Sequence, residues 1–113
     1  IADTHDTPTY VIDLDRIEAN LERLRSAFPD AGIHYAAKAN AGNAVLARLA
    51  EAGAGVECAS AGEVTRALDA GFAAEDVLYT PVNPPDRDLE AVLEVWEPNP
   101  DLTITVGAAD TIE

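Results

Sequence analysis

Residues 33–58, IHYAAKANAGNAVLARLAEAGAGVEC, contain a complete strand–helix–strand unit. The segment 33–37 is predicted as a strand, and a turn over 40–43 follows it. The segment 44–53 has the pattern of a helix that stops at Gly53, and 55–58 is predicted as a second strand. Two such strands joined by one helix run parallel, with a right-handed crossover. This part of the sequence therefore predicts an α/β fold with a parallel sheet.

The same unit recurs along the chain at a regular spacing. Strands are predicted to start at 33, 55, 77 and 102, which are 22, 22 and 25 residues apart. Further helices are predicted over 61–71 and 88–96, the first of them capped by Ser60. Nearer the N-terminus we expect a strand over 9–14 and a helix over 16–28 capped by Asp15.

Two architectures fit this order of elements: an open doubly wound sheet, or the first half of a (β/α)8 TIM barrel. The regular period favours the barrel. A complete barrel needs roughly 250 residues, about twice the 113 present. We therefore expect residues 1–113 to form the N-terminal half of a barrel that continues beyond this chain.

The chain is strongly acidic, with 21 Asp and Glu against 7 Lys and Arg and a formal net charge of −14. This charge repels nucleic acids and anionic membrane surfaces, so it argues against both as partners. Cys58 is the single cysteine, which excludes an internal disulfide, and no leader or long apolar run is present. We expect a soluble cytoplasmic protein, and the excess of acids resembles that of proteins from salt-loving, halophilic organisms.

Polar residues follow every predicted strand, where parallel α/β folds carry their functional groups. Lys38 is the most informative of them because it is the only lysine among seven basic residues. It has two interpretations. It is either a rim lysine that pairs with Glu57 or Glu63, or an amine that forms a Schiff base with a carbonyl compound, which arginine could not do.

Several blocks of the sequence resemble a known enzyme family. Residues 35–40, YAAKAN, resemble the Y-A-x-K-A-N signature of the alanine-racemase-like, fold-type III enzymes that use pyridoxal 5′-phosphate (PLP), in their ornithine/diaminopimelate/arginine decarboxylase branch. Residues 7–13, TPTYVID, are similar to the family's opening T-P-x-Y-V-(I/Y)-D. Residues 56–64, VECASAGEV, are similar to its second-strand block. The resemblance covers almost the whole chain.

The resemblance implies that Lys38 is the catalytic residue that binds PLP as a Schiff base. It places Glu57 where the family has an aspartate near the cofactor, and it matches Ser60 and Glu63 to cofactor-side positions. Ser60 and Glu63 also fit a helix capping pair. The implied activity is a lyase reaction of amino-acid biosynthesis, the decarboxylation of a diamino or basic acid: diaminopimelate to lysine first, ornithine of polyamine synthesis next. A homodimer and an inactive fragment are implied as well.

Other readings of the sequence remain open. The segment after the third strand, with Thr80 and Asn83, departs from the G-N-x-K-S of diaminopimelate decarboxylases. Alternatives are another fold-type III enzyme, such as a D-amino-acid aldolase, dehydratase or racemase, and a non-catalytic PLP-binding protein.

No His, Cys or Asp residues have metal-ligand spacing. His34 is expected in the core, on the same strand face as Lys38, and Cys58 is expected to be a buried thiol.

Overall fold

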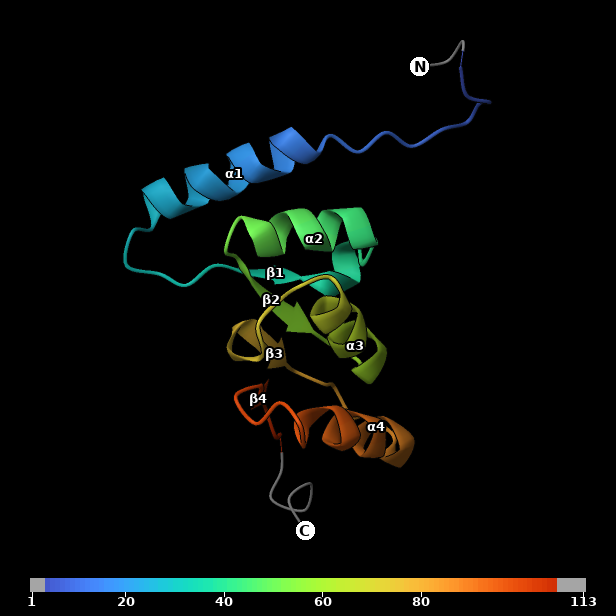
Figure 1. Ribbon diagram of the computed structural model, residues 1–113, viewed down its shortest axis with the longest axis vertical. Coiled ribbons are helices and arrows are strands. Elements are labelled where there is room, and N and C mark those ends of the chain that lie inside the picture. The colour runs from blue at the N-terminus through green and yellow to red at the C-terminus, as the bar shows by residue number, and fades with distance from the viewer. Residues whose placement is uncertain (1–3, 108–113) are drawn as a thin grey trace.

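Four short parallel strands form one sheet in the order β1-β2-β3-β4 in the computed structural model, which describes residues 4–107 (Figure 1). The strands are β1 (His34–Ala36), β2 (Gly55–Cys58), β3 (Val77–Tyr79) and β4 (Thr103–Ile104). Each strand pairs only with its neighbours in sequence, with Tyr35 opposite Val56 and Cys58 opposite Tyr79. The four predicted strands are confirmed, although β4 has two residues where five were expected.

Helices precede the first strand and occupy the connections between the strands. They are α1 (Leu14–Ala27), α2 (Asn43–Glu51), α3 (Ala61–Asp69) and α4 (Asp86–Trp96), with the short 3-10 turns η1 (Ala37–Ala39) and η2 (Ala74–Asp76). A doubly wound sheet reverses its strand order at a switch point, whereas this order runs straight from β1 to β4. The chain is thus the N-terminal part of a barrel of alternating strands and helices. Within the described residues, no helix has the length and apolar character needed to cross a membrane.

The core lies between one face of the sheet and the helices. Val56, Cys58, Val77 and Tyr79 are almost completely buried, at 0–1% exposure, on neighbouring strands. Because side chains alternate along a strand, the residues between them face the other way. This second face, which would be the inside of a barrel, is only partly covered in the described chain, and Glu57 lies on it half-buried.

Residues 9–13 do not form the expected strand, so that prediction is wrong. Tyr10 is 99% exposed and Val11 63% exposed. β-branched and aromatic side chains favour a strand only when a neighbouring strand supplies hydrogen bonds and packing, and no strand among residues 4–107 does so for this segment. The following helix begins at Leu14, and its N-cap is Asp13, whose side chain accepts from the Arg16 amide at 3.1 Å. Asp15 is therefore not the cap.

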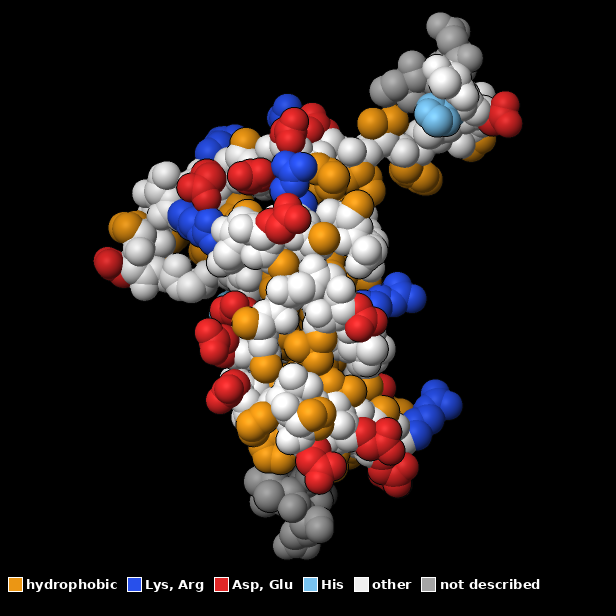
Figure 2. Space-filling view, in the orientation of Figure 1, with side chains coloured by type: hydrophobic (Ala, Val, Ile, Leu, Met, Phe, Trp, Pro, Cys, Tyr) orange, Lys and Arg blue, Asp and Glu red, His pale blue; other side chains and the backbone are white. Residues whose placement is uncertain are grey.

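Helix α1 packs against α2 through an ion-pair cluster on the surface. Arg48 of α2 contacts Asp15 at 3.0 Å and Glu18 at 3.1 Å, both on α1. Figure 2 shows basic side chains lying among acidic ones over these helices, and all the basic residues of both helices are arginines. The cluster joins residues that are 33 and 30 positions apart in sequence.

Candidate active site

The carboxyl ends of the strands lie along one edge of the sheet because all the strands are parallel. Lys38 follows β1 within η1, Ser60 follows β2 and Thr80 follows β3. The fold therefore brings to one edge the polar residues that the sequence places at strand ends. Residues 107–110, GAAD, follow the predicted fourth strand, and 108–110 of them lie outside the described residues.

Lys38 lies in a closed turn that ends β1. Ala37 is fully buried while Lys38 is exposed. The Tyr35 hydroxyl donates to the Asn40 carbonyl at 3.2 Å, and the Gly42 amide donates to Asn40 Oδ1 at 2.9 Å. Burial raises the pKa of Tyr35 and so keeps its hydroxyl protonated as a donor. These two hydrogen bonds give Tyr and Asn a structural role on either side of the lysine.

The Lys38 amine makes no hydrogen bond or ion pair within residues 4–107. Each salt bridge in that range has Arg25 or Arg48 as its cation. Neither Glu57 nor Glu63 therefore pairs with Lys38 there, and the purely structural interpretation of this lysine lacks its expected contact.

Glu57 reaches across from β2 to β3. Its neighbours Val56 and Cys58 are buried in the core, so its side chain lies on the opposite face of the sheet. There its carboxylate accepts a hydrogen bond from the Thr80 hydroxyl. Leu78 is the register partner of Glu57, so Thr80 lies two residues closer to the carboxyl edge. Thr80 thus holds the Glu57 carboxylate at that edge, a contact that the sequence did not reveal.

Ser60 and Glu63 cap the start of α3. Ser60 Oγ accepts from the Glu63 amide at 3.3 Å, which confirms Ser60 as the N-cap. The Glu63 carboxylate accepts from the Ala59 amide at 2.8 Å, one residue before the donor that a standard capping box would use. Both side chains are therefore engaged in ordering the backbone that follows β2.

Cys58 is an inert thiol in the core. Burial raises its pKa to about 12, and the carboxylates of Glu63 and Glu57 add to the shift. A thiol that stays protonated is a poor nucleophile and metal ligand. No group of three or more His, Cys, Asp or Glu side chains in the described part of the chain is placed to hold a metal ion.

His34 is exposed, which contradicts its expected place in the core. Its ring lies over Gly55, where a Cβ atom would come within 2.5 Å of His34 Cδ2. The strand also ends at Ala36, so the alternation expected to place His34 and Lys38 on one face stops before it reaches the lysine.

Asp88 connects three elements, because from α4 it contacts residues of β3 and α3, and the sequence did not predict these contacts. It accepts from the hydroxyl of the fully buried Tyr79 at 2.7 Å and, through both carboxylate oxygens, from the Ala61 amide at 3.3 Å. Burial, followed by this contact, raises the pKa of Tyr79 far above its usual range. The only local signal was an acid in the first turn of α4, which does not reveal a partner 27 residues away.

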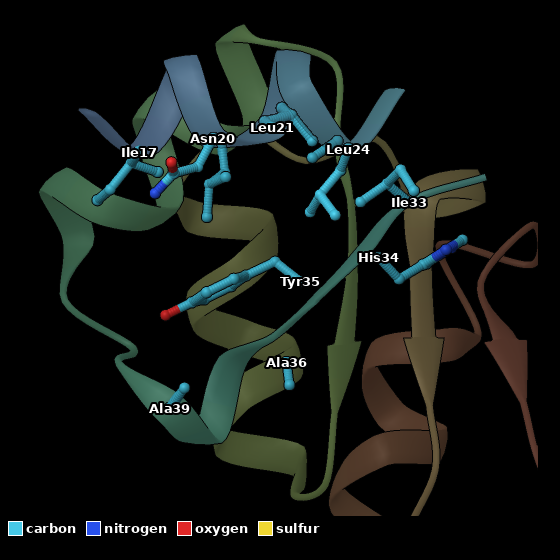
Figure 3. A pocket seen from close by; sticks show the side chains of 11 residues that line it. Ile17, Asn20, Leu21, Leu24, Ile33, His34, Tyr35, Ala36 and Ala39 are labelled. Carbon is cyan, nitrogen blue, oxygen red and sulfur yellow. The ribbon is translucent and has the colours of Figure 1, made fainter. Parts of the chain in front are cut away.

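An apolar cleft of about 370 Å³ lies between α1 and the open edge of β1 (Figure 3). Figure 3 shows side chains of α1, Leu21 and Leu24 among them, pointing toward β1, where Tyr35 lies. Neither Lys38 nor Glu57 lines this cleft. It is therefore separate from the polar edge of the sheet.

Comparison with known proteins assigns a family to this arrangement. Residues 14–111 match the family described as "Pyridoxal-dependent decarboxylase, pyridoxal binding domain". Diaminopimelate decarboxylase of Methanothermobacter thermautotrophicus is 42% identical over 98 residues, which cover 83% of this chain and 23% of that protein. The matched segments of this chain thus span only 19–24% of the length of the curated relatives.

Solved structures agree with this assignment. Diaminopimelate decarboxylase of Helicobacter pylori complexed with L-lysine has a TM-score of 0.82 and 30% identity, over 98% of this chain and 28% of that one. Lysine decarboxylase of Selenomonas ruminantium has a TM-score of 0.76 and 33% identity, over 82% and 25% respectively. The chain therefore belongs to the pyridoxal-binding domain family of the pyridoxal-dependent decarboxylases.

Proposed function

We propose that residues 1–113 are the N-terminal portion of the PLP-binding barrel domain of a longer decarboxylase that converts diaminopimelate to lysine. One observation carries the proposal: the solitary lysine of a chain in the pyridoxal-binding family is exposed at the carboxyl edge of a parallel sheet and pairs with no carboxylate among residues 4–107.

The residues at this edge fit the cofactor that the family uses. Lys38 offers a primary amine on a turn whose backbone is fixed by Tyr35 and Asn40. When bound, PLP supplies an aldehyde for this amine and a ring that stabilises the negative charge left on the substrate carbon after CO2 leaves. Lys38 would hold the cofactor covalently and would be the proton donor or acceptor beside the reacting carbon.

The acidic residues of the edge suit a substrate that carries ammonium groups. Glu57 of β2 and Glu63 of α3 lie on elements that contact η1, which carries Lys38, and the whole chain has a formal charge of −14. Such a field attracts amino groups and repels purely anionic substrates. Ser60 and Glu63 would act on the cofactor side mainly through the backbone that they order after β2.

Two candidate substrates follow from the relatives. Proteins named diaminopimelate decarboxylase, at 34–46% identity, favour diaminopimelate. The likeness to a lysine decarboxylase at 33% identity supports a basic amino acid as the second candidate. The family resemblance also leads us to expect a homodimer of the complete protein.

Borohydride reduction of the complete protein, followed by peptide mass spectrometry, tests the role of Lys38. We expect a pyridoxyl adduct on Lys38 and none at that position in Lys38→Arg, which keeps the charge but removes the amine. An adduct found solely at another lysine would refute the proposal. Release of CO2 from diaminopimelate, ornithine, lysine and arginine, at low and high salt, then identifies the substrate.

A further inference from the structure

Two carboxylates lie on elements that contact η1, the turn that carries Lys38: Glu57 on β2 and Glu63 on α3, and both are held by other hydrogen-bond donors. Glu57 accepts from the Thr80 hydroxyl, and Glu63 accepts from the Ala59 amide at 2.8 Å. Glu57 nevertheless lies on the strand next to the turn that carries the lysine. It is the register partner of Ala36, two residues before Lys38, and η1 contacts β2. Neighbouring strands lie about 4.8 Å apart, a gap that Glu and Lys side chains can bridge.

The direction in which Glu57 points affects the chemistry available to Lys38. An ion pair favours the charged, protonated form of an amine. A protonated amine has no lone pair with which to attack an aldehyde, so pairing with Glu57 would slow the reaction that the proposed function requires. The Thr80 hydroxyl competes for this carboxylate from β3, on the side away from β1.

We propose that Thr80 is a positioning residue: its hydroxyl holds the Glu57 carboxylate toward β3, which leaves the Lys38 amine unpaired and able to react with an aldehyde. The inference rests on the proposed role of Lys38. The inference also relates two departures from the family pattern, Glu57 in place of an aspartate and Thr80 after the third strand. Glu57 is one methylene longer than an aspartate, and its carboxylate contacts the Thr80 hydroxyl.

Competitive acetylation of Lys38 tests this inference without any cofactor. The complete protein is dialysed against hydroxylamine to remove bound aldehydes and then pulsed with isotope-labelled acetic anhydride at pH 8. Peptide mass spectrometry gives the rate at Lys38, and a free lysine derivative with a blocked α-amino group, added to the same sample, serves as the control. We expect Thr80→Val to slow acetylation of Lys38 about threefold, the effect of one exposed ion pair.

Matched variants separate positioning from a general structural effect. Thr80→Ser keeps the hydroxyl and should react at the wild-type rate. In a Glu57→Gln background, Thr80→Val should cause no further slowing, because no carboxylate remains to capture Lys38. Thr80→Ala replaces Thr80→Val if circular dichroism shows that the valine variant does not fold.

Two results would overturn the inference: an unchanged rate at Lys38 in the variant that lacks the hydroxyl, or an equal slowing when Glu57 is already Gln. The borohydride experiment reports on the cofactor itself, whereas acetylation reports only on the amine. Either proposal can therefore fail while the other stands.

Discussion

Replacing Asp88 with alanine should destabilise the protein far more than replacing other acids of the same helix. The substitution leaves the hydroxyl of the fully buried Tyr79 without its partner at 2.7 Å, which costs about 1–3 kcal/mol. It also removes the acceptor of the Ala61 amide at the start of α3, a loss comparable to that of an N-cap, about 1 kcal/mol. We expect Asp88→Ala to lower the free energy of unfolding by about 3 kcal/mol.

A double-mutant cycle isolates the contact with Tyr79. Tyr79→Phe removes the hydroxyl, so Asp88→Ala in that background should cost only about 1 kcal/mol more, which gives a coupling energy of about 2 kcal/mol. Asp86→Ala is the matched control because Asp86 is an exposed acid in the same first turn of α4. Its removal should cost less than about 1 kcal/mol.

Denaturant unfolding of the complete protein measures these differences, and hydrogen exchange of the peptide over 59–64 reports on the Ala61 amide directly. That amide should exchange faster in Asp88→Ala than in Asp86→Ala. Equal destabilisation by the two alanine substitutions, or strict additivity with Tyr79→Phe, would refute the reasoning.

Two further predictions concern the core and the inner face of the sheet. Because the folded protein raises the pKa of Cys58 from 9.0 to about 12, the thiol stays protonated in the folded state while the unfolded state loses the proton. The free energy of unfolding should therefore fall as the pH rises above 9, by up to about 1.4 kcal/mol per pH unit from this group. Denaturation curves at several pH values should show a smaller dependence of this free energy on pH in Cys58→Ala than in the wild type. An identical dependence in both proteins would contradict the raised pKa of Cys58. Gly55→Ala should cost about 1–2 kcal/mol, since the new Cβ would lie 2.5 Å from His34 Cδ2. His34→Ala should restore most of this loss in thermal unfolding of the double variant, whereas persistence of the full loss would place the clash elsewhere.

The elements that the sequence predicted well are those with local chemical boundaries. Strand β2 was predicted at its observed ends because Gly53, with φ of +73°, closes the helix before it and Ser60 caps the helix after it. A positive φ and a side-chain cap depend on neighbouring residues, so they can be inferred from short stretches of sequence.

One error is local, since the cap of α1 is Asp13 and not Asp15. The other errors concern features that depend on distant parts of the chain. A strand over 9–14 needed a neighbouring strand that the described residues do not provide. The contacts of Thr80 with Glu57 and of Asp88 with Tyr79 and Ala61 cross between elements. Such pairings follow from strand order and register, which no local pattern specifies.

Lys38 combines a fixed backbone with a free side chain. Its neighbour Ala37 is completely buried, and hydrogen bonds within 35–42 close the turn, yet the lysine itself is exposed. The amine can therefore swing about its four-carbon stem while the main chain stays in place. Ordering the side chain on a bound partner costs up to about 2 kcal/mol of rotamer entropy, which is regained on release, and neither event requires rearrangement of the strand that carries the lysine.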